Sequence, residues 1–277
     1  VQYVHRILTH AFGDAVRWGL LARNPATLVD PPRVRTREMS VWSAEQLRRF
    51  LSVVADDRLF AMWLLLCTTG MRRGEVLGLR WRDVDLDARR VSVCQTLIDV
   101  RYEVQVSEPK TARGRRPVAL DPVTSAALAA HRERQRAERL VLLGVDEGAD
   151  YVFTQLDGRS LQPQNVSQSF ENIVRRAGLP RIRLHDLRHS AASLALAAGI
   201  HPKVVSERLG HANIQITLDT YSHVVASLQD DAADRMAALI FDTSASTRST
   251  EVSTPPSTPP STSLVRAGEE PLVRGLP

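Results

Sequence analysis

His185, Arg188 and His189 stand within five positions near the start of the stretch IRLHDLRHSAASLALAAG, residues 182–199, whose second half consists mainly of Leu and Ala. In a helix that turns by about 100° per residue, one apolar stripe is formed by Leu184, Leu187, Ala191, Leu194 and Ala198. Arg188 flanks this stripe and His185 lies roughly 60° further round, so their i, i+3 spacing lets both side chains reach one point. That point is either a site or the polar edge of a core.

Two arginines follow an expected helix end in TTGMRRGEVLGLRW. Gly70 is a good helix C-cap, and Arg72 and Arg73 follow after one intervening residue, where a new helix can begin. A helix N-terminus combined with arginine makes a good clamp for a phosphate group. Taken alone, the same residues also fit a solvated basic turn.

Lysine is rare in this chain. Of the 36 Lys and Arg residues, only Lys110 and Lys203 are lysines, a bias that a GC-rich genome explains. An ammonium group can give up a proton near neutral pH when its surroundings lower its pKa, whereas a guanidinium cannot. The stretch SEPKTARGRRPV places Lys110 in the turn of an expected hairpin, where an ordinary exposed lysine is the alternative.

The stretch RLGHANIQITLDTYSHV contains a Gly-His pair at a helix end and Tyr221 ten residues later. His211 alone fits a histidine that caps a helix C-terminus. Tyr221 alone fits a half-buried core tyrosine, since tyrosine is commonly intermediate in burial.

Together these stretches resemble the catalytic domain of the tyrosine recombinases, the phage integrase family. The family order is present: Arg in TGMRRGE, Lys in PKTARGRRPV, His-x-x-Arg in HDLRH, His in LGHANIQIT and Tyr in TYSHV. The resemblance covers roughly residues 40–230, and RNPATLVDPP looks like the linker that follows the family's core-binding domain.

The resemblance implies a metal-free DNA transesterification in which Tyr221 attacks a phosphate and forms a 3′-phosphotyrosine. Arg72 and Arg188 would neutralise the charge that gathers on the phosphate oxygens. Lys110 would protonate the leaving 5′-oxygen, and His211 would bind the phosphate. His185 would assist the deprotonation of Tyr221, whose ordinary pKa is near 10.

Further residues take lesser parts in this prediction. Glu75 matches an acidic position of the family and is expected to support the site. The basic residues expected to contact DNA are Arg73, Arg113, Arg115 and Arg116. His189 matches no catalytic role and is expected to be structural. The partners implied are double-stranded DNA attachment sites and accessory DNA-bending or directionality factors. The chain is expected to form a homotetramer on DNA and to be a monomer without it.

Two other functions stay open on the sequence. One is a type IB topoisomerase-like strand transferase, which the compact hairpin lysine and LGH patterns disfavour. The other is a non-catalytic DNA-binding module of the same fold, which the filled chemical positions disfavour.

Other chemistries lack their patterns. The sequence contains neither GxxxxGK[ST] nor GxGxxG, so no nucleotide cofactor is expected. DVDLD begins like a calcium loop, but Ala88 and Cys94 occupy the positions that need Gly and Glu. His185 and His189 have the spacing of a zinc helix, yet Asp186 replaces its glutamate and Arg188 would repel a metal. No metal and no cofactor are expected.

The elements expected to position these residues are mainly helical with a small antiparallel β-sheet, an α+β fold with the architecture of a tyrosine-recombinase catalytic domain. Ser43 and Gln46 form a capping box. Helices are expected near residues 57–69, 122–142, 163–177, 185–199, 202–209, 213–221 and 223–241. Strands are expected in RRVSVCQTLIDV, RYEVQVSE and RRPVALD.

The chain divides into four expected parts. Residues 1–30 are the last helix of a helical core-binding domain, 31–40 a linker, 41–242 the catalytic domain, and 243–277 a disordered Ser/Thr/Pro-rich tail. The helix at 223–241 is a candidate for packing on a neighbouring protomer.

Composition agrees with a nucleic-acid partner. The 277 residues carry a net charge of +5, and the longest apolar run, LFAMWLLLC, is too short to cross a bilayer. Two cysteines make no disulfide framework, which favours the cytoplasm.

Overall fold

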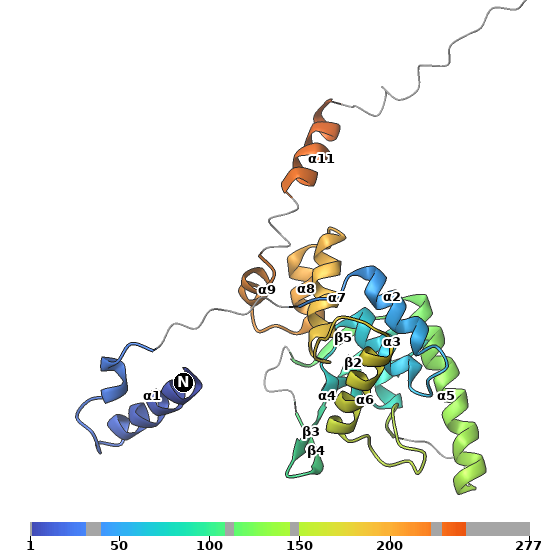
Figure 1. The fold of residues 1–277 in the computed structure, drawn as a ribbon, viewed down its shortest axis with the longest axis horizontal. Helices are drawn as coiled ribbons and strands as arrows, with labels where there is room; N and C mark the ends of the chain where they lie inside the picture. The colour runs from blue at the N-terminus through green and yellow to red at the C-terminus, as the bar shows by residue number, and fades with distance from the viewer. Residues whose placement is uncertain (1, 32–39, 109–113, 145–149, 223–228, 242–277) are drawn as a thin grey trace, which may run out of the picture. The chain divides into compact units, whose positions relative to one another are not determined.

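The structure is a computed structural model that describes residues 2–31, 40–108, 114–144, 150–222 and 229–241. Most of these residues are helical, and the few strands lie between α4 and α5 (Figure 1). The chain divides into a unit up to Leu228 and a unit from Gln229 onward. Among the described residues, no helix is long and apolar enough to cross a membrane.

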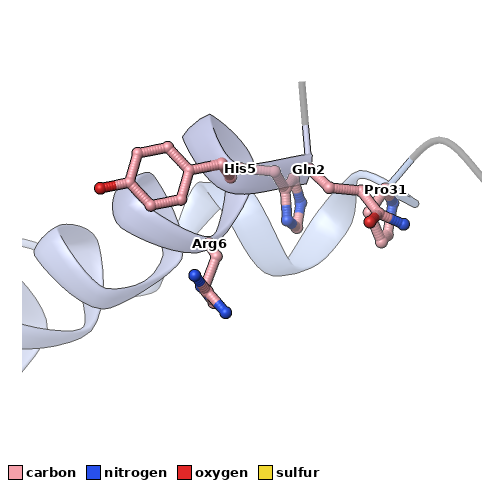
Figure 2. A pocket seen from close by; sticks show the side chains of 5 residues that line it. Gln2, His5, Arg6 and Pro31 are labelled. Carbon is pink, nitrogen blue, oxygen red and sulfur yellow. The ribbon is translucent and has the colours of Figure 1, made fainter. Parts of the chain in front are cut away.

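The N-terminal part consists of helix α1 (Gln2–Arg17) and the 3₁₀-helix η1 (Pro25–Leu28). His5 holds the two together, because its Nε2 lies 3.1 Å from both Ala26 O and Val29 O. Asn24 caps η1 and donates a bond to Thr9 O. Figure 2 shows Gln2, His5 and Pro31 grouped around a shallow pocket at the start of α1.

Helices α2 (Ala44–Val53), α3 (Phe60–Thr69) and α6 (Pro163–Arg176) meet in an aromatic core. The expected capping box of Ser43 and Gln46 starts α2. Phe170 lies with its ring centroid 5.7 Å from Trp42, 5.5 Å from Phe50 and 6.2 Å from Trp63. Since all four side chains are fully buried, this cluster is the centre of the main core.

The strands form two small antiparallel sheets, where the sequence predicted one small antiparallel sheet. One sheet orders the strands β1 (Val84–Asp85), β2 (Arg90–Val93) and β5 (Arg116–Ala119) as β1-β2-β5. The other is the hairpin of β3 (Thr96–Val100) and β4 (Glu103–Ser107). The expected strand RRVSVCQTLIDV is interrupted between Val93 and Thr96, which sends its two halves to different sheets.

This topology also corrects the hairpin expected around Lys110. Strand β4 pairs with β3 and strand β5 pairs with β2, so the strands on either side of Lys110 do not pair with each other. The segment that contains Lys110 therefore connects two sheets. Lys110 and Arg113 themselves lie outside the described residues.

Between α3 and β1 the chain forms the short helix α4 (Arg73–Leu77) and the 3₁₀-helix η2 (Trp81–Asp83). Helix α5 (Pro122–Leu143) begins at Asp121, whose side chain accepts a bond from Thr124 N, and ends at Gly144 in the left-handed conformation. His131 and Gln135 of α5 contact Val152 O, which ties this helix to the segment before α6.

The last helices of the first unit are α7 (Asp186–Ala197), α8 (Pro202–Leu209) and α9 (Ile214–Thr220). Helix α7 packs on α3 and α8, and α8 packs on α9 (Figure 1). These contacts enclose a second, smaller core of Ala192, Leu196, Val205, Leu209 and Tyr221.

Gly70 shows how closely α3 approaches α7 and α8. It ends α3 with a φ of 65°, and a Cβ there would lie 2.8 Å from Leu209 Cδ2. The expected C-cap at Gly70 is therefore confirmed, and the position requires glycine for both its conformation and its packing.

Helix α11 (Gln229–Phe241) lies in the second unit. Its described side chains include the exposed Met236, Ile240 and Phe241. The Ser/Thr/Pro-rich segment expected to be disordered, residues 243–277, lies outside the described residues, and the expected domain boundaries stay a prediction.

Replacing Phe170 by Ala should lower the free energy of unfolding by about 3–5 kcal/mol, because it opens a cavity at the centre of the aromatic core. Denaturation by urea, followed by Trp fluorescence, measures the change. Ser169→Ala, at the adjacent exposed position of α6, is the control and should stay within about 0.5 kcal/mol of the parent. A loss below about 1 kcal/mol for Phe170→Ala would contradict the central place of this cluster.

Candidate active site

A cleft of about 710 Å³ gathers most of the described residues that the sequence singled out. It is walled by the start of α4, the β3–β4 hairpin, the start of α7 and the turn between α8 and α9. Its lining includes the candidates Arg72, Glu75, His185, Arg188 and His211. The segments that carry these residues lie as much as 139 positions apart in the chain, from 72 to 211, so only the fold brings them together.

Arg188 is the most deeply buried cation of the cleft, with 4% of the residue exposed. Its Nη1 donates to Gly70 O at 2.8 Å and its Nη2 to Leu209 O at 2.7 Å. These carbonyls belong to the C-terminal ends of α3 and α8, where the helix dipole favours a positive charge. Burial, together with the charge of Arg72, lowers the pKa of Arg188 to about 9, so the guanidinium stays charged at neutral pH.

Glu75 is buried between two arginines. Its carboxylate accepts bonds from Arg72 N and Arg72 Nη1, each at 2.8 Å. It also accepts bonds from Arg116 Nη1 at 3.1 Å and Nη2 at 2.9 Å. Burial alone would raise the pKa of Glu75, but the hydrogen bonds and charges of Arg116 and Arg72 bring it below its ordinary value. Glu75 therefore stays ionised and orients both cations.

Arg116 is not placed to contact DNA, which corrects the sequence prediction. Its side chain is only 6% exposed, and it donates to Glu75, to Gly114 O and, through Nε, to Arg208 O at 2.7 Å. Every nitrogen of its guanidinium thus has an internal acceptor. Arg116 fastens β5 to α4 and α8, and Gly210 makes room for it, since a Cβ there would lie 2.8 Å from Arg116 Nη1.

The other basic residues expected to bind DNA differ in their surroundings. Arg73 Nη1 donates to Ser167 Oγ at 2.6 Å and to Pro163 O at 3.0 Å, so its guanidinium is attached to α6 and is not part of the cleft lining. Arg115 is exposed and forms a 2.8 Å ion pair with Glu108. Arg113 lies outside the described residues.

His211 follows the left-handed Gly210 that ends α8. Its Nδ1 lies 2.8 Å from Oγ1 of Thr217, a fully buried residue of α9. The contact holds one edge of the imidazole and leaves Nε2 for the cleft. Burial and the charges of Arg188 and Arg72 lower the pKa of His211 to about 4, so the ring is neutral at pH 7.

His185 precedes α7 and is exposed at the cleft. Partial burial and its neighbours His189 and Arg188 lower its pKa to about 4. The expected i, i+3 relation to Arg188 is confirmed in the sense that both residues line the same cleft.

Tyr221 is fully buried, which differs from the half-buried position that tyrosine commonly takes. Its ring belongs to the small core between α7 and α8, and burial raises its pKa to about 12. Its hydroxyl lies 2.8 Å from Nδ1 of His189, and the charge of Arg188 also acts on it. Tyr221 itself is not among the residues that line the cleft, whereas His189 and Thr220 are.

The contact of His189 with Tyr221 is the feature that sequence reasoning missed. His189 was expected to be structural, and His185 was expected to assist Tyr221. His189 lies one helical turn after His185, with their ring centroids 5.3 Å apart, so the sequence did contain a second histidine near the expected site. The turn after α9 that brings Tyr221 against His189 is a tertiary feature, and no pattern in the sequence predicts it.

Among the described residues, no group of three or more His, Cys, Asp or Glu side chains is arranged to hold a metal ion.

A model of the phage integrase family matches residues 41–227. The chain belongs to the phage integrase family.

The curated relatives agree with this assignment. The XerC-like tyrosine recombinase of Caldanaerobacter subterraneus subsp. tengcongensis is 33% identical, over 85% of this chain and 65% of that protein. The ICEBs1 integrase of Bacillus subtilis is 29% identical, over 87% of this chain and 66% of that protein. This integrase-family chain thus spans about two thirds of the length of these relatives.

Solved structures share the fold. The integrase of the transposon Tn1549 in complex with a circular intermediate DNA has a TM-score of 0.70 at 24% identity, over 86% of this chain and 78% of that chain. The XerA recombinase has a TM-score of 0.54 at 23% identity, over 76% of this chain and 66% of that chain. The expected α+β fold, mainly helical with a minor antiparallel β part, is therefore confirmed as that of the phage integrase family.

Replacing Glu75 by Gln in this integrase-family site should lower the free energy of unfolding by about 3–5 kcal/mol at pH 7, because Arg116 then stays buried without a counter-ion. Urea denaturation measures the change. Glu133→Gln, which alters an exposed ion pair of α5, is the control and should have a small effect.

The same substitution should change the pH dependence of stability. Because the pKa of Glu75 is lower in the folded protein than its unfolded value of about 4.3, its contribution is complete above that value and is lost as the pH falls below it. Glu75→Gln should therefore lose less stability than the parent when the pH is lowered from 5 to 3. Parallel losses in the two proteins would contradict the buried ion pair.

Replacing Thr217 by Val should cost about 1–3 kcal/mol of stability, because Nδ1 of His211 loses its partner while the shape of the residue is kept. Thr217→Ser keeps the hydroxyl and should cost clearly less. Urea denaturation of the two variants measures the difference. Equal losses would mean that the hydroxyl and its contact with His211 contribute no more to stability than the packing of the methyl group.

Proposed function

We propose that this chain is the catalytic part of a site-specific DNA recombinase, which cleaves and rejoins duplex DNA through a 3′-phosphotyrosine without metal or ATP. The observation that carries the proposal is that Arg72, Arg188 and His211 line one cleft and that the Tyr221 hydroxyl contacts His189, another residue of the cleft lining. Membership of the phage integrase family supports it, as do solved structures of Tn1549 integrase and lambda integrase with DNA.

The arginines supply the phosphate site. Attack on a phosphodiester gathers negative charge on the non-bridging oxygens, and guanidinium groups that are already fixed stabilise this charge without rearrangement. Arg188 is fixed by two helix-end carbonyls and Arg72 by Glu75, so both are held in place before DNA arrives. Neutral His211 adds a hydrogen bond from Nε2 to the phosphate, since Thr217 holds its Nδ1 edge.

Lys110 is the proposed proton donor for the leaving 5′-oxygen. It lies in the sequence between Glu108 and Gly114, and both of these residues line the cleft. Two residues of chain span at most about 7 Å, so a lysine two positions after Glu108 can reach the phosphate. The exposed Arg115, and Arg113 two positions before it in the sequence, are the proposed contacts to the DNA backbone.

The phenol of Tyr221 must lose its proton to attack. Burial raises its pKa to about 12, so ionisation at neutral pH needs a base and the cationic surroundings that Arg188 provides. The attack joins the Tyr221 oxygen to phosphorus and breaks the bond from phosphorus to the 5′-oxygen.

The proposed partners are double-stranded DNA attachment sites and further copies of this chain, as a homotetramer on DNA, with accessory DNA-bending or directionality factors. The net charge of +5 supports a polyanionic partner. The exposed apolar side chains of α11 support a contact with a neighbouring protomer. The proposed location is the cytoplasm.

Tyr221→Phe should abolish the covalent adduct but keep DNA binding, because it removes the nucleophilic oxygen alone. The assay incubates the chain with nicked suicide duplexes, taken from the DNA that flanks its coding sequence, and resolves adducts on a denaturing gel. Tyr151→Phe, which removes the hydroxyl of another tyrosine, is the control and should form the adduct.

The outcomes separate the candidate functions. An adduct of normal yield from Tyr221→Phe removes Tyr221 from the mechanism. Retained DNA binding without any adduct from the parent chain supports the non-catalytic binding module. If the parent chain forms the adduct and relaxes supercoiled DNA but does not join two duplexes, the topoisomerase-like strand transferase is supported.

A further inference from the structure

The hydroxyl of Tyr221 has a defined partner. Its Oη lies 2.8 Å from His189 Nδ1, and the ring centroids of the two residues are 5.9 Å apart. The tyrosine ring is buried in the small core between α7 and α8, and packing in this core fixes its position. His189 lines the cleft, and its Nδ1 contacts the Tyr221 hydroxyl.

We propose that His189 is the catalytic base of this site, which holds the Tyr221 hydroxyl and takes its proton during cleavage. The proposal rests on the proposed recombinase function. It replaces the assignment of this role to His185, whose ring is exposed at the cleft and lies next to His189 rather than in contact with the hydroxyl.

The surroundings of His189 suit a base. On its own helix it faces Asp186, Arg188 and His185, and from other segments it faces Arg183, His211 and Tyr221. Burial and the charges of Arg188 and Arg183 lower the pKa of His189, whereas the charge of Asp186 raises it. The net effect is a pKa below the ordinary value of histidine. The imidazole is therefore neutral at pH 7, and a lone pair on Nδ1 can accept the phenol proton.

The negative charge of Asp186 stabilises the imidazolium of His189 once it forms. Its carboxylate is ionised and held by Arg183, with Arg183 N at 2.8 Å and Nη2 at 2.7 Å. The charge of Asp186 acts on His189 in the direction that favours the protonated ring. The phosphate bound beside Arg188 adds a second negative charge near the same ring.

The step balances as follows. The Tyr221 oxygen forms a bond to phosphorus, the bond from phosphorus to the 5′-oxygen breaks, and the phenol proton moves to His189 Nδ1. The 5′-oxygen leaves as a hydroxyl with a proton from Lys110. In rejoining, the 5′-hydroxyl attacks phosphorus, Lys110 takes its proton, and the imidazolium of His189 returns a proton to the departing tyrosine.

The test compares His189→Asn with His185→Asn in single-turnover cleavage of the nicked suicide duplex between pH 6.5 and 9. In His189→Asn the amide oxygen replaces Nδ1 as an acceptor for the hydroxyl but cannot take the proton. We expect its cleavage rate at pH 7 to fall by about 10²-fold or more. The rate should then rise about tenfold per pH unit, as hydroxide replaces the missing base, while the parent rate stays nearly constant.

His185→Asn is the matched control, because His185 lies one helical turn before His189 and also lines the cleft. We expect its rate to lie below the parent by a factor that stays constant with pH. Thermal unfolding and DNA binding, measured on each variant, separate a loss of folding from a loss of chemistry. His189→Gln serves as the second variant if His189→Asn does not fold.

Three outcomes overturn the inference. A pH profile of His189→Asn parallel to that of the parent makes His189 a structural residue. A steep profile in His185→Asn, with a parallel one in His189→Asn, returns the role of base to His185. The absence of any Tyr221-dependent adduct from the parent chain contradicts the recombinase function itself, and the role of His189 with it.

Discussion

The buried carboxylate of Glu75 is the interaction on which the cleft depends. Arg72, Arg116 and Arg188 lie close enough for their charges to act on one another, and like charges at such range repel strongly where water is excluded. Glu75 accepts four hydrogen bonds from the first two of these arginines. It thereby joins α4 to β5 and, through the bond from Arg116 to Arg208 O, to α8.

Helix ends complete the electrostatic balance. Arg188 has no carboxylate in direct contact among the described residues, and its charge is met by the last carbonyls of α3 and α8. These carbonyls are free to accept because both helices end in a left-handed glycine, Gly70 and Gly210. Since Arg188 bonds to backbone rather than to acid, it keeps a net positive charge for an anionic ligand in the cleft.

Tyr221 and His211, the proposed nucleophile and the proposed phosphate-binding histidine, are linked through α9. Thr217 accepts the backbone N–H of Tyr221 with its carbonyl and contacts His211 with its hydroxyl. One residue of α9 thus contacts both His211 and Tyr221, whereas His189 and Arg188 belong to α7. The proposed active site thus consists of a cationic part at α4 and α7 and a part held by α9, which meet at the contact between His189 and Tyr221.

Local structure and family membership could be predicted from the sequence. Capping residues and apolar periodicity act over a few neighbours, so Ser43, Gly70 and the 3.6-residue repeats located most helices correctly, and five short motifs in order identified the phage integrase family.

The remaining features depend on tertiary structure. Strand pairing joined β4 to β3 instead of to β5, because short polar-faced strands do not specify their partner. Tertiary contacts also bury Arg116 and place His189, rather than His185, against the Tyr221 hydroxyl. Both depend on contacts between segments more than 30 positions apart, from Glu75 to Arg116 and from His189 to Tyr221, and residue spacing along one helix carries no information about them.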